Sequence, residues 1–246
     1  MELLKSHKSV REYSSKSITN ALLNDVLESG IRVSNTGNMQ LYSVVVTTDA
    51  EMKDRLSPFH FNQRMVRGAS VVLTICIDFN RFSQWCKINC TSTDFSSVLW
   101  LLNGVIDASI LAQNICIAAE NEGIGICYLG TTLYNPKEIS EILELPIGVV
   151  PVTTVTMGYP EGIHEVADRL ALSAIVHREK YSKYSDEEVM QIYHEKESLE
   201  SSRRFVVENS KENLAQVYAE VRYKSTDSEF FSGKLIEFLR EQGFRL

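Results

Sequence analysis

The feature that most constrains the fold of this chain is an apolar helical pattern between residues 95 and 123. Apolar residues recur there at alternating steps of three and four, which is the spacing of one helix face. One row contains Val98, Leu101, Val105, Ala108, Ala112, Ile115 and Ala119, and a second row beside it contains Leu99, Leu102, Ile106 and Ile110. A helix of about 28 residues is ~40 Å long, and this one is apolar over more of its circumference than a surface helix requires. We therefore expect a central, buried helix that also packs against a second subunit.

Apolar, β-branched runs on both sides of this helix predict the strands of a sheet. Residues 42–49 and 69–78 precede the helix, while "IGICYLG" and "GVVPVTTVTMGYP" follow it. Because nearly continuous apolar runs suit strands covered on both faces, we expect the first two to lie centrally in one sheet. Between them, residues 52–68 begin as a short helix and continue beyond Pro58 as a polar and aromatic loop.

Residues that start and stop helices predict two shorter ones. Thr19 is placed to cap a helix that Gly30 would end. Asn135 is the expected N-cap of another helix, with Pro136 at its first position and Glu138 completing a capping box.

The last third of the chain has a lower apolar density than the rest and no proline after residue 160. Ser185 with Glu188 predicts a capped helix, and residues 229–242 predict an amphipathic helix ended by Gly243. No linker divides the chain into independent domains. We therefore expect a single domain over 1–246, in which residues 161–246 form a C-terminal extension that wraps a partner subunit.

Composition and motif searches exclude several classes of function. A net charge of -7 argues against a general nucleic-acid surface. The N-terminus lacks a signal-peptide core, and no uninterrupted apolar run approaches the ~20 residues of a membrane span, so we expect a cytoplasmic protein. Cys86 and Cys90 have no second ligand pair at metal-like spacing, so we expect no metal site. Nucleophile-elbow, Rossmann and P-loop motifs are absent.

The stretch "SHKSVREYSS" concentrates positive charge at residues 6–15 of this acidic chain. His7, Lys8 and Arg11 precede the first expected helix, and the polar loop "RVSNTGNMQ" follows that helix. If the helix folds the two stretches together, cations meet hydroxyls, amides and free backbone N–H groups, an arrangement that suits a phosphate and a polar heterocycle. A solvated basic turn is the alternative interpretation.

The order and spacing of several stretches resemble the FMN-dependent nitroreductases, and among them the NADPH-preferring nitroreductase and flavin reductase branch. The stretches are "HKSVREY", "SNTGNMQ", "GVIDASILAQNICIAAENEGIGICYLG", "EISEILELPIGVVPVTTVTMGYP" and "ADRLALSAIVHREKY". The resemblance implies an α+β sandwich with a mixed, mainly antiparallel sheet flanked by helices. It also implies a homodimer that shares the long central helix and holds two FMN sites.

The resemblance also implies a set of FMN-binding residues. They are His7, Lys8, Ser9, Arg11, Asn35, Thr36, Gly37, Asn38, Gln63, Tyr128, Leu129, Gly130, Thr131 and Arg169, of which residues 35–38 often come from the partner subunit in the family. Arg203 and Arg204 lie where branch members grip the extra phosphate of NADPH. For Tyr128 the alternative is a half-buried strand tyrosine, and for Arg169, Arg203 and Arg204 it is a surface position.

Two positions depart from the family pattern. Ala167 stands where the family has a lysine, and Asp168 stands where a neutral residue is expected. One cation is lost and one anion is gained next to Arg169, although Lys8 could compensate. His60, His164, His177 and His194 have no spaced companions, so we interpret them as structural or surface residues.

The implied activity is ping-pong transfer of a hydride from NAD(P)H to FMN N5 and then to a nitroaromatic, a quinone or free flavin. No catalytic side chain is needed, because the cofactor carries the chemistry. Two alternatives stay open. One is an FMN-binding redox sensor or store without turnover, and the other is a different flavin chemistry on the same fold, such as dehalogenation.

Overall fold

The computed structural model describes all residues, 1–246, and they form two compact units. The first unit comprises Met1–Val166 and Phe231–Leu246, and the second comprises Ala167–Phe230. The first unit contains α1 (Glu2–Lys5), α2 (Asn20–Gly30), η1 (Thr36–Asn38), β1 (Tyr42–Thr47), α3 (Ala50–Leu56), η2 (Ser57–His60), α4 (Arg64–Gly68), β2 (Val71–Asp78), α5 (Asn80–Ile88), α6 (Val98–Asn121), β3 (Gly125–Leu129), η3 (Gly130–Tyr134), α7 (Pro136–Ile142), β4 (Val149–Gly158) and most of α11 (Ser225–Glu241).

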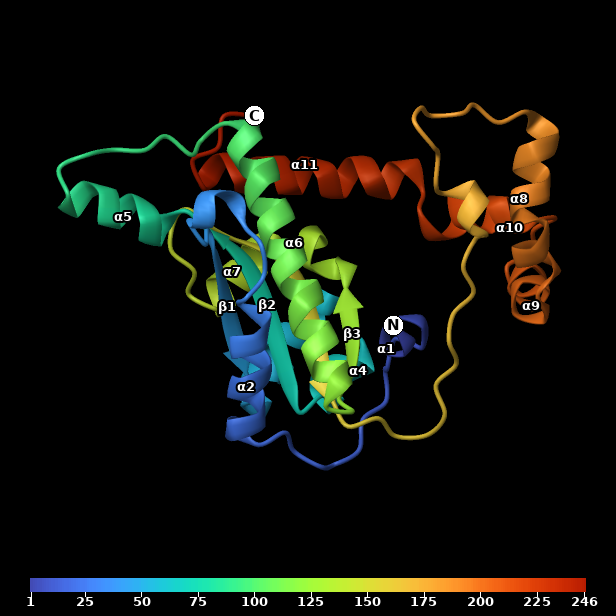
Figure 1. The fold of residues 1–246 in the computed structure, drawn as a ribbon, viewed down its shortest axis with the longest axis horizontal. Helices are drawn as coiled ribbons and strands as arrows, with labels where there is room; N and C mark the ends of the chain where they lie inside the picture. Colours follow the sequence, from blue (N-terminus) through green and yellow to red (C-terminus); the bar gives the residue numbers. More distant parts are fainter. The chain divides into compact units, whose positions relative to one another are not determined.

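The first unit is built on a four-stranded sheet with the order β1-β2-β4-β3. Figure 1 labels three of its strands, β1, β2 and β3. All three pairings are antiparallel, with Val45 opposite Thr74, Thr74 opposite Thr154 and Tyr128 opposite Val155. A parallel bridge between Ser9 and Ile126 adds the N-terminal segment beside β3. The expected α+β sandwich with a mainly antiparallel sheet is confirmed.

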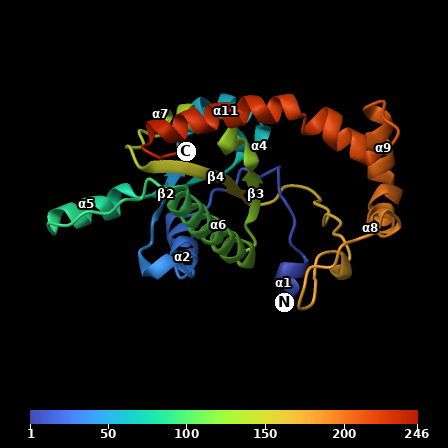
Figure 2. The same cartoon turned by 90° about the horizontal axis from the view of Figure 1, so that it is seen from above.

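Helices cover both faces of this sheet. Figure 2 shows α2 and α6 on one side, and α7, α4 and α11 on the other. The core between sheet and helices includes strand residues such as Leu73 and Ile75, helix residues such as Leu111 and Ile115, and Phe238 near the end of α11. Burial of these apolar side chains is the main force that holds the layers together.

Helix α6 has the two-sided character expected from the sequence. One row is buried and contains Ala108, Leu111, Ala112, Ile115, Cys116 and Ala119. The second row stays exposed, since Leu99, Leu102, Ile106 and Ile110 are 66%, 55%, 55% and 41% exposed. By length and mean hydropathy α6 could also cross a membrane, although Asp107 and other polar residues interrupt its apolar run. Its contacts with α2 and with all four strands are those of a core helix.

The structure differs from the sequence-based expectations in several details, among them a short helix, α4 (Arg64–Gly68), within the expected loop beyond Pro58. β1 lies at the edge of the sheet rather than in its centre, and Val46 is 40% exposed. Gly30 is the last residue of α2 but does not end it by a left-handed turn, because the C-cap, Ile31, is right-handed. Gly30 is required by packing instead, since a Cβ there would lie 2.2 Å from Cγ1 of Ile115 on α6.

The start of α7 also differs from the expectation. Asn135 precedes the helix as expected, but its side chain makes no capping bond and donates from Nδ2 to the Phe59 carbonyl at 2.8 Å. Glu138 turns away to an ion pair with Lys234 of α11, at 3.0 Å. Tertiary contacts have therefore replaced the local capping box.

The second unit contains η4 (Leu172–Ala174), α8 (Asp186–Ser198), α9 (Glu200–Glu208), α10 (Leu214–Gln216) and the π-helical turn η5 (Val217–Arg222). The capping box of Ser185 and Glu188 is present at the start of α8, as expected. Only Leu214 and Val217 are fully buried within this unit. It has almost no apolar core of its own.

Candidate functional site

The N-terminal segment is fastened to the edge strand β3. The backbone N–H of Val10 donates to the Ile126 carbonyl at 2.8 Å, next to the Ser9–Ile126 bridge. This close approach requires Gly125, because a Cβ there would lie 2.6 Å from Val10. Further along, the Tyr13 hydroxyl lies 2.8 Å from both the Val10 carbonyl and Thr156 Oγ1, and its burial raises the pKa of Tyr13.

This attachment leaves three donor side chains unpaired beside β3. Lys8, Ser9 and Arg11 make no side-chain hydrogen bond or ion pair within the chain. The positive charge of Arg11 acts on Cys127 of β3, where it opposes the rise in thiol pKa that burial causes. In a chain with more acidic than basic residues, two cations without carboxylate partners are candidates for binding an anion.

His7 and Tyr128 face the C-terminal half of α6. His7 Nδ1 lies 2.7 Å from Glu120 Oε1, so one ring nitrogen is already engaged within the chain. The Tyr128 hydroxyl donates to Gln113 Oε1 at 3.4 Å, and burial raises its pKa. Tyr128 is 36% exposed, so part of its side chain remains accessible.

The turn after β3 is supported by the loop that carries Gln63. Thr131 Oγ1 lies 2.9 Å from Nδ1 of the buried His60, and the Gln63 backbone N–H donates to the His60 carbonyl at 3.2 Å. The side-chain amide of Gln63 has no partner in the chain. Beside Gly130 the space is open, with no atom within 4 Å of a Cβ built there. The structure therefore brings Gln63, Gly130 and Thr131 to one end of β3.

The loop that contains residues 35–38 is also anchored to α6, but at a different position from His7. Asp107 of α6 accepts from the Thr36 backbone N–H at 3.0 Å and from the Thr36 hydroxyl at 3.1 Å. Asn35 Oδ1 accepts from the Gln40 backbone N–H at 3.0 Å. Gly37 and Asn38 are left exposed at the tip, both in the left-handed region.

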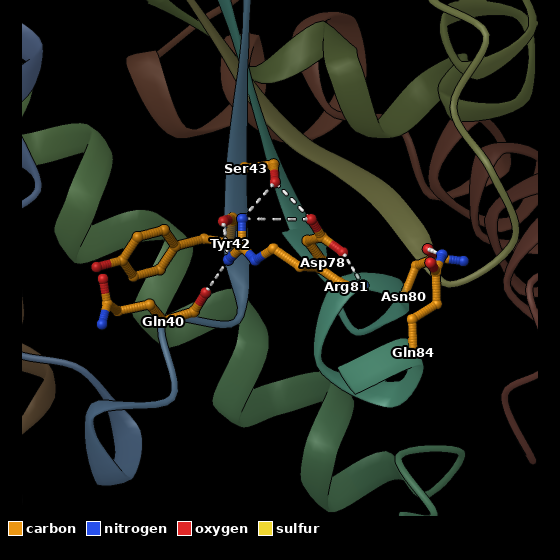
Figure 3. A network of polar contacts seen from close by, with 7 residues as sticks. All are labelled: Gln40, Tyr42, Ser43, Asp78, Asn80, Arg81 and Gln84. Atoms are coloured by element: carbon orange, nitrogen blue, oxygen red, sulfur yellow. Dashed lines mark hydrogen bonds and ion pairs between the residues drawn. The ribbon is translucent and has the colours of Figure 1, made fainter. Parts of the chain in front are cut away.

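Arg81 of α5 fixes the end of this loop where it enters β1 (Figure 3). Its guanidinium donates to the carbonyls of Gln40 and Tyr42, and its Nη1 lies 3.7 Å from Asp78 Oδ2. Asp78 also accepts from the Ser43 hydroxyl. One arginine thus joins the loop end, β1 and the end of β2.

The two predicted halves of the site do not meet within one chain. The loop is tied to α6 at Asp107 and the basic segment at Glu120, and 13 residues of helix separate these anchors by about 20 Å. The expectation that α2 folds the two stretches together is therefore wrong for a single chain. The reason is that α2 packs along α6, so the stretches before and after α2 are held at different positions along α6.

The second unit holds the remaining predicted cations. The Arg169 guanidinium donates to the carbonyls of Ala167 and Asp168, at 3.2 and 2.9 Å. The unexpected carboxylate of Asp168 is paired with Lys196 at 2.7 Å, which offsets the anion gained at that position.

On α9, Arg203 and Arg204 are both exposed. Arg204 lies 3.7 Å from Glu208, whereas Arg203 has no carboxylate partner within the chain. Arg203 is therefore the freer of the two for an external phosphate.

Asp107 and Glu120, which anchor the two halves of the site, were not predicted from the sequence. Both are carboxylates on a helix that is otherwise mostly apolar. Asp107 is only 3% exposed. Since buried carboxylates need partners, an isolated acidic residue in the mostly apolar 95–123 pattern indicates a polar contact with another part of the chain.

The donor set fits FMN. Lys8 and Arg11 offer unpaired charge for a phosphate, Ser9 and Gln63 offer neutral donors, and the open space beside Gly130 leaves the backbone accessible. A ligand with an anionic end and a polar, flat heterocycle matches these groups.

Comparison with known proteins agrees with this fit. The sequence profile of the Nitroreductase family matches residues 4–159. A "CR(VI) reductase" from Pseudomonas sp. (strain G-1) is 34% identical over 79% of this chain and 80% of its own length. The NADPH-flavin oxidoreductase of Vibrio harveyi is 30% identical over 77% of both chains. A crystal structure of a candidate oxidoreductase from Bacteroides fragilis NCTC 9343 is 48% identical, covers 100% of both chains and superposes with a TM-score of 0.98.

The chain therefore belongs to the nitroreductase family. This confirms the resemblance seen in the sequence and the fold class that it implied.

Proposed function

We propose that this protein is an FMN-dependent oxidoreductase that uses NAD(P)H to reduce nitroaromatics, quinones or free flavin. The observation that carries the proposal is the set of unpaired donors at Lys8, Ser9, Arg11 and Gln63 around β3 in a member of the nitroreductase family. The expected enzyme class and cofactors agree with the names of the relatives, which include an NADPH-flavin oxidoreductase.

When bound, FMN supplies the hydride-accepting and electron-donating chemistry, and the protein supplies binding, orientation and electrostatics. Lys8 and Arg11 would hold the phosphate and offset its charge. Gln63 and the backbone around Gly130 would bind the polar heterocycle and fix its orientation. We propose Arg169 as a further FMN-binding residue on the family resemblance alone.

We further propose that the protein works as a homodimer formed through α6. The exposed row of Leu99, Leu102, Ile106 and Ile110 is a continuous apolar face on a helix whose other face is already buried. Dimerisation would cover this row. It would also bring the 35–38 loop of one chain toward the 7–11 segment of the other, which a single chain does not achieve.

The same proposal gives the C-terminal extension its role. The second unit exposes large apolar side chains, among them Met190 at 68% and Tyr223 at 66%, and buries few. Such a unit needs a surface to pack against. We propose that residues 161–246 extend a single nitroreductase-like domain and wrap the partner subunit, and that Arg203 and Arg204 contact the NADPH phosphate. We also propose that the protein acts in the cytoplasm.

The test is a visible absorption spectrum of the purified protein, repeated without oxygen after adding NADPH and then a nitroaromatic or a quinone. Bleaching of a bound flavin and its recovery with acceptor would support the proposal. A flavin that binds but stays yellow with both NADPH and NADH would favour a store or sensor. A chain that refuses FMN would overturn the proposal.

A matched pair of variants tests the binding residues. We expect Arg11→Gln to weaken FMN binding by about 10-fold or more, because a charge-assisted bond to a phosphate is lost. Lys5→Gln removes an exposed charge from nearby α1 and should leave FMN affinity unchanged. Equal effects of both variants would argue against a specific phosphate site at Arg11.

A further inference from the structure

His60 is a buried histidine on η2 whose side chain has a single hydrogen-bond partner. It is 0% exposed, its Nδ1 lies 2.9 Å from Thr131 Oγ1, and its Nε2 has no partner. Burial lowers the pKa of His60 to about 4, so the ring is neutral at physiological pH. A neutral imidazole carries one N–H, and the position of that proton decides whether Nδ1 donates a hydrogen bond to the Thr131 hydroxyl or accepts one from it.

The surroundings favour a proton on Nδ1. With the proton on Nε2, the ring would bury an N–H donor without an acceptor. With the proton on Nδ1, the donor is satisfied by Thr131 Oγ1 and only an acceptor nitrogen is left unpaired. Orphaned buried donors are the rarer and more costly case in proteins.

A proton on Nδ1 determines how the Thr131 hydroxyl is used. If Oγ1 accepts from His60, its own proton cannot point back at the ring and is available to an external acceptor. The next residue, Thr132, shows the contrast. Its hydroxyl donates to the Leu129 carbonyl at 3.0 Å and lies 2.9 Å from Thr154 Oγ1, so it is used entirely inside the protein. Thr131 is partly exposed, whereas Thr132 is 0% exposed.

We propose that His60 is a positioning residue that donates from Nδ1 to Thr131 and thereby presents the Thr131 hydroxyl proton to an acceptor atom of the flavin ring. The proposal rests on the FMN function proposed above, and it adds a donor that depends on a residue outside the predicted site. Flavin rings carry carbonyl oxygens and unprotonated nitrogens that can accept such a bond.

The first experiment reads the tautomer directly, without cofactor. Nitrogen-15 chemical shifts of the His60 ring in the apoprotein report which nitrogen carries the proton. We expect a protonated Nδ1 and an unprotonated Nε2 at pH 7. A protonated Nε2 would overturn the proposal, because Thr131 would then donate to the ring and have no free proton.

The second experiment measures FMN affinity of the apoprotein by calorimetric titration. We expect Thr131→Val and His60→Leu each to weaken binding by about 5- to 10-fold, the effect of one hydrogen bond, and the double variant to be no weaker than either single one. His60→Asn, whose side-chain N–H can take the place of Nδ1–H, should bind within about 2-fold of the wild type. Additive losses, or no rescue by asparagine in a folded protein, would overturn the proposal.

Thr132→Val is the matched control. It removes a buried hydroxyl next to Thr131, so it should lower the melting temperature but leave FMN affinity unchanged. If it weakens FMN binding as much as Thr131→Val, the effect belongs to the turn as a whole and the specific role of Thr131 is wrong. If the wild type itself does not bind FMN, the proposed function fails, whereas the tautomer measurement still tests the His60–Thr131 relationship.

Discussion

Asp107 of α6 holds Thr36 through both its backbone N–H, at 3.0 and 3.1 Å, and its hydroxyl, at 3.1 Å. The loop after α2 thereby provides hydrogen-bond donors for a buried carboxylate. In turn, the position of this loop is set by its attachment to α6. The geometry of residues 35–38 therefore depends on α6, the same helix that we propose as the dimer interface.

Replacing this carboxylate tests the dependence. We expect Asp107→Ala to lower the free energy of unfolding by about 2 to 3 kcal/mol, because the Thr36 donors lose a charged acceptor in a buried place. Urea unfolding measures the change. Asp25→Ala removes an exposed carboxylate from α2 and should have an effect within about 0.5 kcal/mol. Equal stability of the two variants would show that the loop does not need Asp107.

The exposed row of α6 gives a prediction about assembly. Ile106→Glu should raise the dissociation constant of the dimer by about 100-fold or more, because a carboxylate would be buried there without a partner. Sedimentation velocity measures the shift, and loss of bound FMN should accompany it. Ile147→Glu, at a position 69% exposed between α7 and β4, is the control and should leave the dimer intact. A dimer that tolerates Ile106→Glu places the interface elsewhere.

The end of α11 gives a prediction about the core. Phe238 is 3% exposed within the main apolar cluster. Phe238→Ala should cost about 3 to 5 kcal/mol of stability, because it leaves a cavity among close-packed side chains. Ile236→Ala lies on the same helix at 40% exposure and should cost much less. Similar losses from both, measured by thermal unfolding, would mean that α11 is only loosely attached.

His60 predicts a pH dependence of stability. An unfolded histidine takes up a proton near pH 6.5, whereas His60 in the folded protein stays neutral down to a pKa of about 4. Between these values the unfolded chain binds more protons, so the free energy of unfolding falls as the pH falls. From pH 7 to pH 4 the contribution of His60 is about 3 kcal/mol.

Urea unfolding at a series of pH values measures this slope. His60→Asn should remove the contribution, and the control His194→Asn, on an exposed position of α8, should keep it. The burial argument for His60 fails if the asparagine variant loses stability with acid as steeply as the wild type.

Much of the fold could be predicted from the sequence where a single physical signal, such as apolar periodicity, determines the element. The rows of α6, the buried runs of β2 and β4, and the Thr19 cap depend on periodicity or on one local bond, and the structure reproduces them. β1 was misplaced because its run "YSVVV" matches that of a central strand, whereas its edge position depends on strand order. α5 was not predicted at all, because "NRFSQWCKI" mixes polar and apolar residues without a long repeat.

The site was predictable in parts for the same reason. The resemblance supplied residues such as Arg11 and Gln63, and the structure shows both with free side chains beside β3 and η3. It could not show that Thr36 is used by Asp107 or that Thr131 is paired with His60. Those are contacts between residues 71 apart in the chain, and no local pattern encodes them.

The position of α11 has a consequence for biosynthesis. Its last turns and the residues behind them complete the core, where Phe244 packs on Phe79, and the Arg245 backbone N–H donates to the Ser96 carbonyl. A ribosome delivers the strands and α6 long before these residues. The nascent chain must therefore carry an open apolar core through the synthesis of residues 167–230, and it can close that core only when residues 231–246 emerge. Chaperone demand should thus be highest late in translation.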